Sequence, residues 1–153
     1  MLYLTFLHLH SVVRWVALLG LAARVGRSAM ALAQNDGWKP LDRIISIVAT
    51  SAMDTQLLIG CVLFFGLSPI SATAMADMGA AMRDPNLRFY AVEHTSTMFL
   101  AILLAHVGQI LGKRSQDERR KHVYSLACYG VALLMVLVAI PWPFRALVGR
   151  GLY

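Results

Sequence analysis

Four long apolar runs constrain this chain more than any other feature of its sequence. They cover roughly residues 3–26, 44–67, 88–112 and 122–143, and each has at least the ~18 residues that a membrane-crossing helix needs. Because 58% of the residues are hydrophobic and only 14% are charged, little remains outside these runs. The sequence therefore predicts an all-α fold, a four-helix transmembrane bundle in which residues 1–153 form one integral membrane domain.

Basic residues are concentrated in two of the three connections between the runs. Residues 24–43 hold four Lys or Arg against two Asp, and residues 113–121 hold five Lys or Arg against two acids. The positive-inside rule places these two connections in the cytoplasm and both termini outside, in a bacterial inner membrane. The net charge of +6 is thus a topology signal. Since no base-reading motif accompanies it, we expect no nucleic-acid partner.

Ionisable side chains within the apolar runs mark candidate functional positions, because such groups are expensive at membrane depth. The third run carries His94, and the first carries His10. At 1.5 Å per residue, His10 lies roughly 5–6 Å and His94 roughly 9 Å outward from the midplane. Two imidazoles on different helices at similar depth can bind one iron from opposite sides. We therefore predict a haem b between the first and third runs.

Three arginines and one aspartate could support that site. Arg14 lies four residues after His10 on the same helical face, and both Arg14 and Asp54 fall near the midplane. We favour a structural Arg14–Asp54 ion pair; in the alternative, Arg14 binds a haem propionate and Asp54 relays protons. Arg88 and Arg145 lie near the outer surface, where they could bind propionates or act as interfacial anchors.

Glu93 and the other histidines leave alternatives open. Glu93 could accept a proton from a membrane quinol, which makes quinone a candidate ligand, or it could bond to a neighbouring helix. His106 lies twelve residues after His94 and about 120° away from its face. A second haem held by His106 and His122 is an alternative, although His122 could instead be a solvated residue at the inner boundary.

Small residues follow His94 at helical spacing. This face carries Met98, Ala101, Ala105, Gly108 and Gly112. It could let a cofactor approach closely, or it could pack directly against another helix.

Cys61 and Cys128 differ in depth by roughly 15 Å, so we expect two free thiols.

Several segments resemble one family across nearly the whole chain. They are Leu7-His-Leu-His-Ser-Val-Val-Arg-Trp15, Gln56-Leu-Leu-Ile-Gly60, the histidine of the third run and Ile140-Pro-Trp-Pro-Phe144. The chain resembles the small four-span bacterial membrane proteins labelled cytochrome b, found especially in Bacteroidetes. That resemblance implies a b-type haem protein whose matching positions are His10, Arg14 and His94. The chain lacks the histidine that family members carry near Met53 or Asp54.

Two functions of different class follow. The first is an electron-transfer subunit, rather than a stand-alone enzyme, which moves electrons between the quinone pool and a partner through one haem, or two. The second is a haem-free accessory subunit of a larger respiratory or photosynthetic complex. In both, the expected partners are the lipid bilayer and other membrane subunits.

Overall fold

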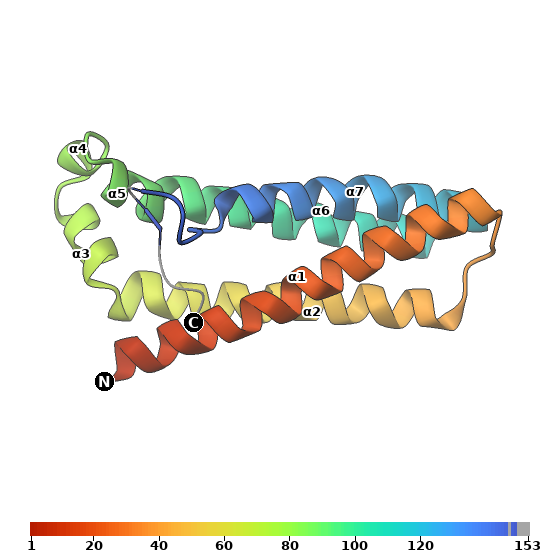
Figure 1. Cartoon of the computed structure of the whole chain (residues 1–153), viewed down its shortest axis with the longest axis horizontal. Coiled ribbons are helices and arrows are strands. Elements are labelled where there is room, and N and C mark those ends of the chain that lie inside the picture. Colours follow the sequence, from red (N-terminus) through yellow and green to blue (C-terminus); the bar gives the residue numbers. More distant parts are fainter. Residues whose placement is uncertain (147, 150–153) are drawn as a thin grey trace.

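The computed structural model describes residues 1–146, 148 and 149, and its regular structure in that part of the chain is entirely helical. Four helical segments are long and apolar enough to cross a membrane, as the sequence predicted. They are α1 (Leu2–Gln34), α2 (Pro40–Val62) with the π-helix η1 (Leu63–Leu67), the segment 85–114, and α7 (Glu118–Ala139). The segment 85–114 comprises α5 (Pro85–Arg88), the π-helix η2 (Phe89–Glu93) and α6 (His94–Arg114). The chain is therefore a multi-pass membrane protein built as one helical bundle (Figure 1).

The helices that meet at the first connection are longer than predicted. Helix α1 continues to Gln34, where Asn35 ends it in the left-handed conformation (φ 52°). Only residues 35–39 then separate α1 from α2. Arg24 and Arg27, which we expected in the connection, consequently lie on the last turns of α1.

Helix α7 also begins earlier than predicted. It starts at Glu118, because the Asp117 side chain caps it by accepting a hydrogen bond from the Arg120 backbone N–H. His122 therefore belongs to the helix and is fully buried, which rules out the alternative of a solvated residue at the boundary. The helix ends at Ala139, since Pro141 cannot continue it.

The small-residue face of α6 packs directly against α7. Ala101 and Ala105 have no exposed surface, and Gly108 is buried. A Cβ atom added to Gly108 would lie 2.7 Å from Cys128 Cβ and 3.2 Å from the Tyr129 ring. This close approach shows that the face packs directly against another helix and not against a cofactor. Met98 is the exception.

The bundle is less tightly closed at one end. Helix α1 crosses the others obliquely, so its N-terminal half diverges from α6 and α7 while its C-terminal half approaches them (Figure 1). The short helices α3 (Pro69–Ala76) and α4 (Met78–Ala81) lie with α5 across this end. Both π-helices also lie here: η1 follows the last residue of α2, and η2 joins α5 to the first residue of α6. The candidate site occupies this end.

Candidate functional site

A cavity of about 500 Å³ lies at the diverging end of the bundle. Its walls come mainly from α1, α2 and α6, with η1, α3 and the start of the segment after α7 completing them. Apolar side chains dominate the lining, and the polar exceptions that matter here are His10, Arg14, Gln56 and His94. An apolar cavity with a few convergent polar groups is the usual form of a small-molecule or cofactor site.

His10 and His94 both line this cavity, and their rings lie edge-on to each other. Their ring centroids are 6.4 Å apart, and the ring planes meet at 66°. His10 comes from α1 and His94 is the first residue of α6. The structure therefore brings together the two histidines that the sequence placed at similar depth.

His10 is enclosed but poorly satisfied by the protein. Its Nδ1 atom is buried and has no hydrogen-bond partner among the described residues, and the same holds for Gln56 Oε1. Gly60 allows α2 to approach the ring, since a Cβ there would lie 3.6 Å from His10 Cε1. Buried polar atoms are normally paired, so two unpaired atoms in one cavity indicate a missing ligand or water.

His94 has a defined tautomer. Its Nδ1 lies 2.8 Å from the backbone carbonyl of Ala139, at the end of α7. A carbonyl only accepts hydrogen bonds, so Nδ1 carries the proton and donates it. The lone pair is then on Nε2, which is the atom available to a metal. This is the arrangement that commonly orients a metal-binding histidine.

Arg14 also lines the cavity, as its position four residues after His10 predicted. Its side chain is buried and its guanidinium carbon lies 5.5 Å from the Trp15 ring centroid. The predicted Arg14–Asp54 ion pair is wrong, because Asp54 instead binds His106 Nε2 at 2.8 Å. Arg14 faces the cavity from α1, whereas Asp54 on α2 is turned toward α6.

The charged side chains of Arg88, Glu93 and Arg145 bind elsewhere than in the cavity. Arg88 Nε donates to Glu93 Oε1 at 2.7 Å, so Glu93 is bonded to its own helical segment. Arg145 stacks on Phe89 with its guanidinium carbon 4.7 Å from the ring centroid, and it donates to the Val138 carbonyl. Neither arginine lines the cavity, and neither does Glu93.

His106 and His122 are not brought together either. His106 lies at the α2–α6 boundary with Asp54, and each side chain is roughly half-exposed there, at 40% and 46%. His122 is buried near the opposite end of the bundle, where its Nδ1 lies 3.4 Å from Arg24 Nη2. The geometry gives no support to a second haem held by this pair.

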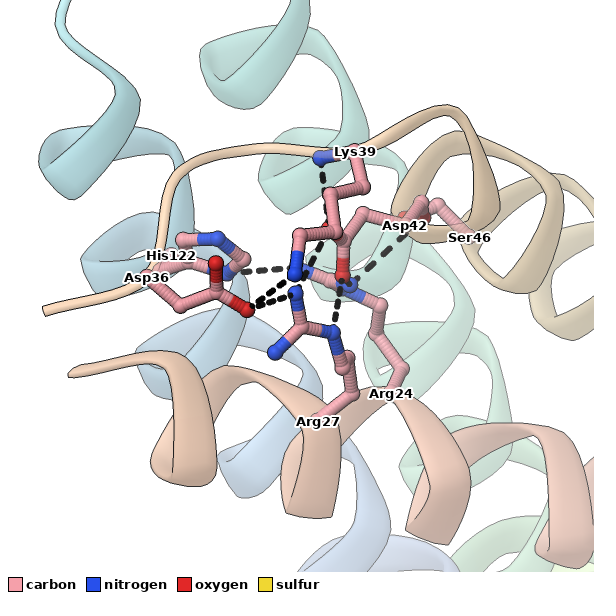
Figure 2. A network of polar contacts seen from close by, with 7 residues as sticks. All are labelled: Arg24, Arg27, Asp36, Lys39, Asp42, Ser46 and His122. Carbon is pink, nitrogen blue, oxygen red and sulfur yellow. Dashed lines mark hydrogen bonds and ion pairs between the residues drawn. The ribbon is translucent and has the colours of Figure 1, made fainter. Parts of the chain in front are cut away.

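His122 instead belongs to a buried polar network, shown in Figure 2, that sequence reasoning missed. Arg24 and Asp42 have no exposed surface, and Arg24 Nη1 donates to Asp42 Oδ1 at 2.9 Å. Arg27 Nε adds a second contact to the same oxygen at 3.1 Å. The network joins α1, α2 and α7. In the sequence, the only indication of this network is that the oppositely charged Arg24 and Asp42 each lie beside an apolar run.

The connection 35–39 is tied to this network. Asp36 Oδ2 accepts hydrogen bonds from Lys39 Nζ at 2.7 Å and Arg27 Nη2 at 2.8 Å. These two cations hold the pKa of the Asp36 carboxyl below its usual value. The Trp38 ring lies under Arg24, whose guanidinium carbon is 4.5 Å from the ring centroid.

The two cysteines are free thiols, as predicted. Comparison of the chain with protein-family models, with curated proteins and with solved structures finds no match. The function of the chain is therefore inferred from the geometry of the cavity.

Proposed function

We propose that this chain is a b-type haem protein that carries single electrons between a membrane quinol and a partner protein. The observation that carries the proposal is the separation of 6.4 Å between the His10 and His94 ring centroids. Two imidazoles that bind opposite sides of one metal ion at about 2 Å have ring centroids about 6 Å apart. The two rings thus already have the spacing that a shared metal requires.

The donor set favours a macrocycle over a bare ion. A bare metal ion in a protein usually takes four or more protein or water ligands. Among the described residues, no group of three or more His, Cys, Asp or Glu side chains could hold one. Two imidazoles complete the coordination of an iron that already has four porphyrin nitrogens. When bound, haem supplies the one-electron centre, while the protein supplies ligands, orientation and exclusion of water.

Each polar group of the cavity has a role in this proposal. His94 presents Nε2, because the Ala139 carbonyl holds the proton on Nδ1. His10 reaches the same space from α1 with its ring packed beside Gly60. Arg14 places a permanent positive charge in the cavity wall, where a propionate would be attracted. The surrounding apolar side chains keep the site at low dielectric.

A haem count on purified protein tests the proposal. The chain is expressed in a bacterial membrane with sufficient haem and purified in detergent, and the pyridine haemochrome assay gives haem per chain. We expect about one haem with paired-imidazole absorption bands. His10→Ala and His94→Ala should each abolish the bands, because each removes an axial ligand.

His8→Ala is the matched control. His8 is exposed on the same helix two residues before His10, so its removal should leave haem content unchanged. Full haem content in both the His10→Ala and His94→Ala proteins would refute the proposed ligands. A colourless preparation that co-purifies stoichiometrically with a membrane complex would instead favour the haem-free accessory subunit.

A further inference from the structure

His106 and Asp54 form an ionisable pair that joins two membrane-spanning segments. Among the ion pairs of this kind in the described part of the chain, it is the most exposed. Their hydrogen bond measures 2.8 Å, and they retain 40% and 46% exposure. Ionisable groups at this depth normally face the bundle interior or a polar cavity. A half-exposed pair that faces outward therefore indicates that something other than hydrocarbon covers it.

The surroundings favour a small ligand over another helix. The exposed side chains of α6 around His106 are bulky, as Phe99, Leu103 and Ile110 show with exposures of 56%, 51% and 48%. Helices that pack together in membranes prefer small residues at their contact, and the small-residue face of α6 is already covered by α7. The outward face of α6 is thus suited to lipid, or to a molecule that dissolves in lipid.

The pair lies at the boundary between α2 and α6, next to the cavity but outside its lining. Met53 and Leu57, which flank Asp54 in α2, line the cavity. Ile102, one turn before His106 in α6, lines it too. The cavity also reaches exposed residues of both segments, Cys61 and Phe65 on one side and Thr95 on the other. Because both side chains of the pair are half-exposed, a flat molecule can reach them directly from the bilayer.

The hydrogen-bonding character of the pair selects the ligand. When Asp54 is ionised and His106 is neutral, His106 carries its one ring proton on Nε2 and donates it to Asp54 Oδ1. His106 Nδ1 and Asp54 Oδ2 then remain as acceptors, and neither has a hydrogen bond to another described residue. A ligand for this site must be apolar in its body and must donate hydrogen bonds from hydroxyl groups.

We propose that His106 and Asp54 bind the head group of a membrane hydroquinone, whose hydroxyls donate to these two acceptors. This inference extends the proposed function, since it assigns a place to the electron donor. It also replaces Glu93 as the quinol-binding acid, because Glu93 is bonded to Arg88.

The test uses duroquinol, a tetramethyl hydroquinone, and its dimethyl ether, which has the same ring but no hydroxyl donors. Binding is measured by calorimetry on the purified chain in lipid nanodiscs, kept reduced so that no electron transfer adds heat. We expect duroquinol to bind and the ether to bind about tenfold more weakly or worse, the equivalent of one lost hydrogen bond.

Substitutions locate the site. Asp54→Asn replaces an acceptor by a donor of similar shape, and His106→Phe removes the Nδ1 acceptor while it keeps a ring. Each should weaken duroquinol binding about tenfold. Thr55→Ala is the control, because Thr55 is exposed beside Asp54 but its hydroxyl bonds to the Ser51 carbonyl. Helical content and melting temperature are measured for every variant.

Three outcomes would overturn the inference. They are equal binding of duroquinol and its ether, unchanged binding by the Asp54→Asn protein, and a wild-type dimer that Asp54→Asn converts to monomers. Haem is counted on the same samples to separate the two proposals. Duroquinol binding by a haem-free chain would support this site and end the proposed electron transfer, whereas a haem-bearing chain that binds no duroquinol would overturn this site alone.

Discussion

Two glycines show how differently the same residue can be used in this bundle. Gly108 of α6 has so little space that an added Cβ would lie 2.7 Å from Cys128 Cβ. Gly130 of α7 has no heavy atom within 4 Å of an added Cβ. Both lie inside long helices, so a helix-propensity argument treats them alike. Only their neighbours distinguish them.

Gly108→Ala should destabilise the protein by about 1–3 kcal/mol, because the added methyl forces α6 and α7 apart. Gly130→Ala should leave stability unchanged or raise it by about 0.5 kcal/mol, because alanine favours the helix and meets nothing. Thermal unfolding in detergent, followed by circular dichroism, measures both. Equal effects of the two substitutions would contradict the packing of α6 on α7.

The two histidines of α6, His94 and His106, also differ in what surrounds them. Both lie on α6, and their twelve-residue spacing correctly separated their faces by about 120°. The spacing could not say what each face meets. His94 faces the cavity and the Ala139 carbonyl, whereas His106 faces Asp54, because α7 and α2 lie on different sides of α6.

At the scale of elements, the C-terminal end of α1 depends on one buried ion pair. Arg24 and Asp42 are both fully buried, and Asp42 also accepts hydrogen bonds from Arg27 and the Lys39 backbone N–H. These contacts join the last turns of α1 to the first turn of α2. A buried charge that loses its partner is expensive, although a complete pair adds little by itself.

Asp42→Asn should therefore lower the stability by about 3 kcal/mol or more, because it leaves Arg24 without its buried counter-charge. Arg43→Gln is the matched control, since Arg43 is the next residue and is exposed. Its effect should stay within about 0.5 kcal/mol. The midpoint of thermal unfolding in detergent reports both, and similar midpoints for the two variants would refute the structural role of the pair.

The π-helices η1 and η2 are elements that periodicity did not anticipate. Each π-type hydrogen bond spans one residue more than in an α-helix, so side chains within it depart from the 100° spacing. A continuous α-helix over the predicted run 88–112 would place successive side chains at that regular spacing. In η2 that regular spacing is lost directly before His94, at the edge of the cavity.

At the scale of the whole molecule, the charge pattern predicts the orientation in the membrane. The short connection between α6 and α7 should be cytoplasmic, and the segment that contains α3 should be outside. Thr73 is exposed on α3, and Gln116 is exposed in the α6–α7 connection. Helix α3 and the α6–α7 connection lie at opposite ends of the bundle (Figure 1).

A single cysteine introduced by Thr73→Cys should react with a membrane-impermeant maleimide in spheroplasts. A cysteine introduced by Gln116→Cys should react only after lysis, because the inner membrane protects it. The chain without an added cysteine gives the background from Cys61 and Cys128. The reverse labelling pattern would show that the positive-inside assignment is wrong.

The sequence by itself determined the architecture, because four apolar runs of sufficient length have few alternatives to four membrane-crossing helices. It also identified His10, Arg14 and His94 as neighbours, since depth along a helix follows from residue number at 1.5 Å per residue. Tertiary structure alone decided the partners. The Arg24–Asp42 pair, the His106–Asp54 pair and the α6–α7 contact depend on how each helix is rotated and how far its ends extend. Those quantities arise from packing among all the helices, which no single run encodes.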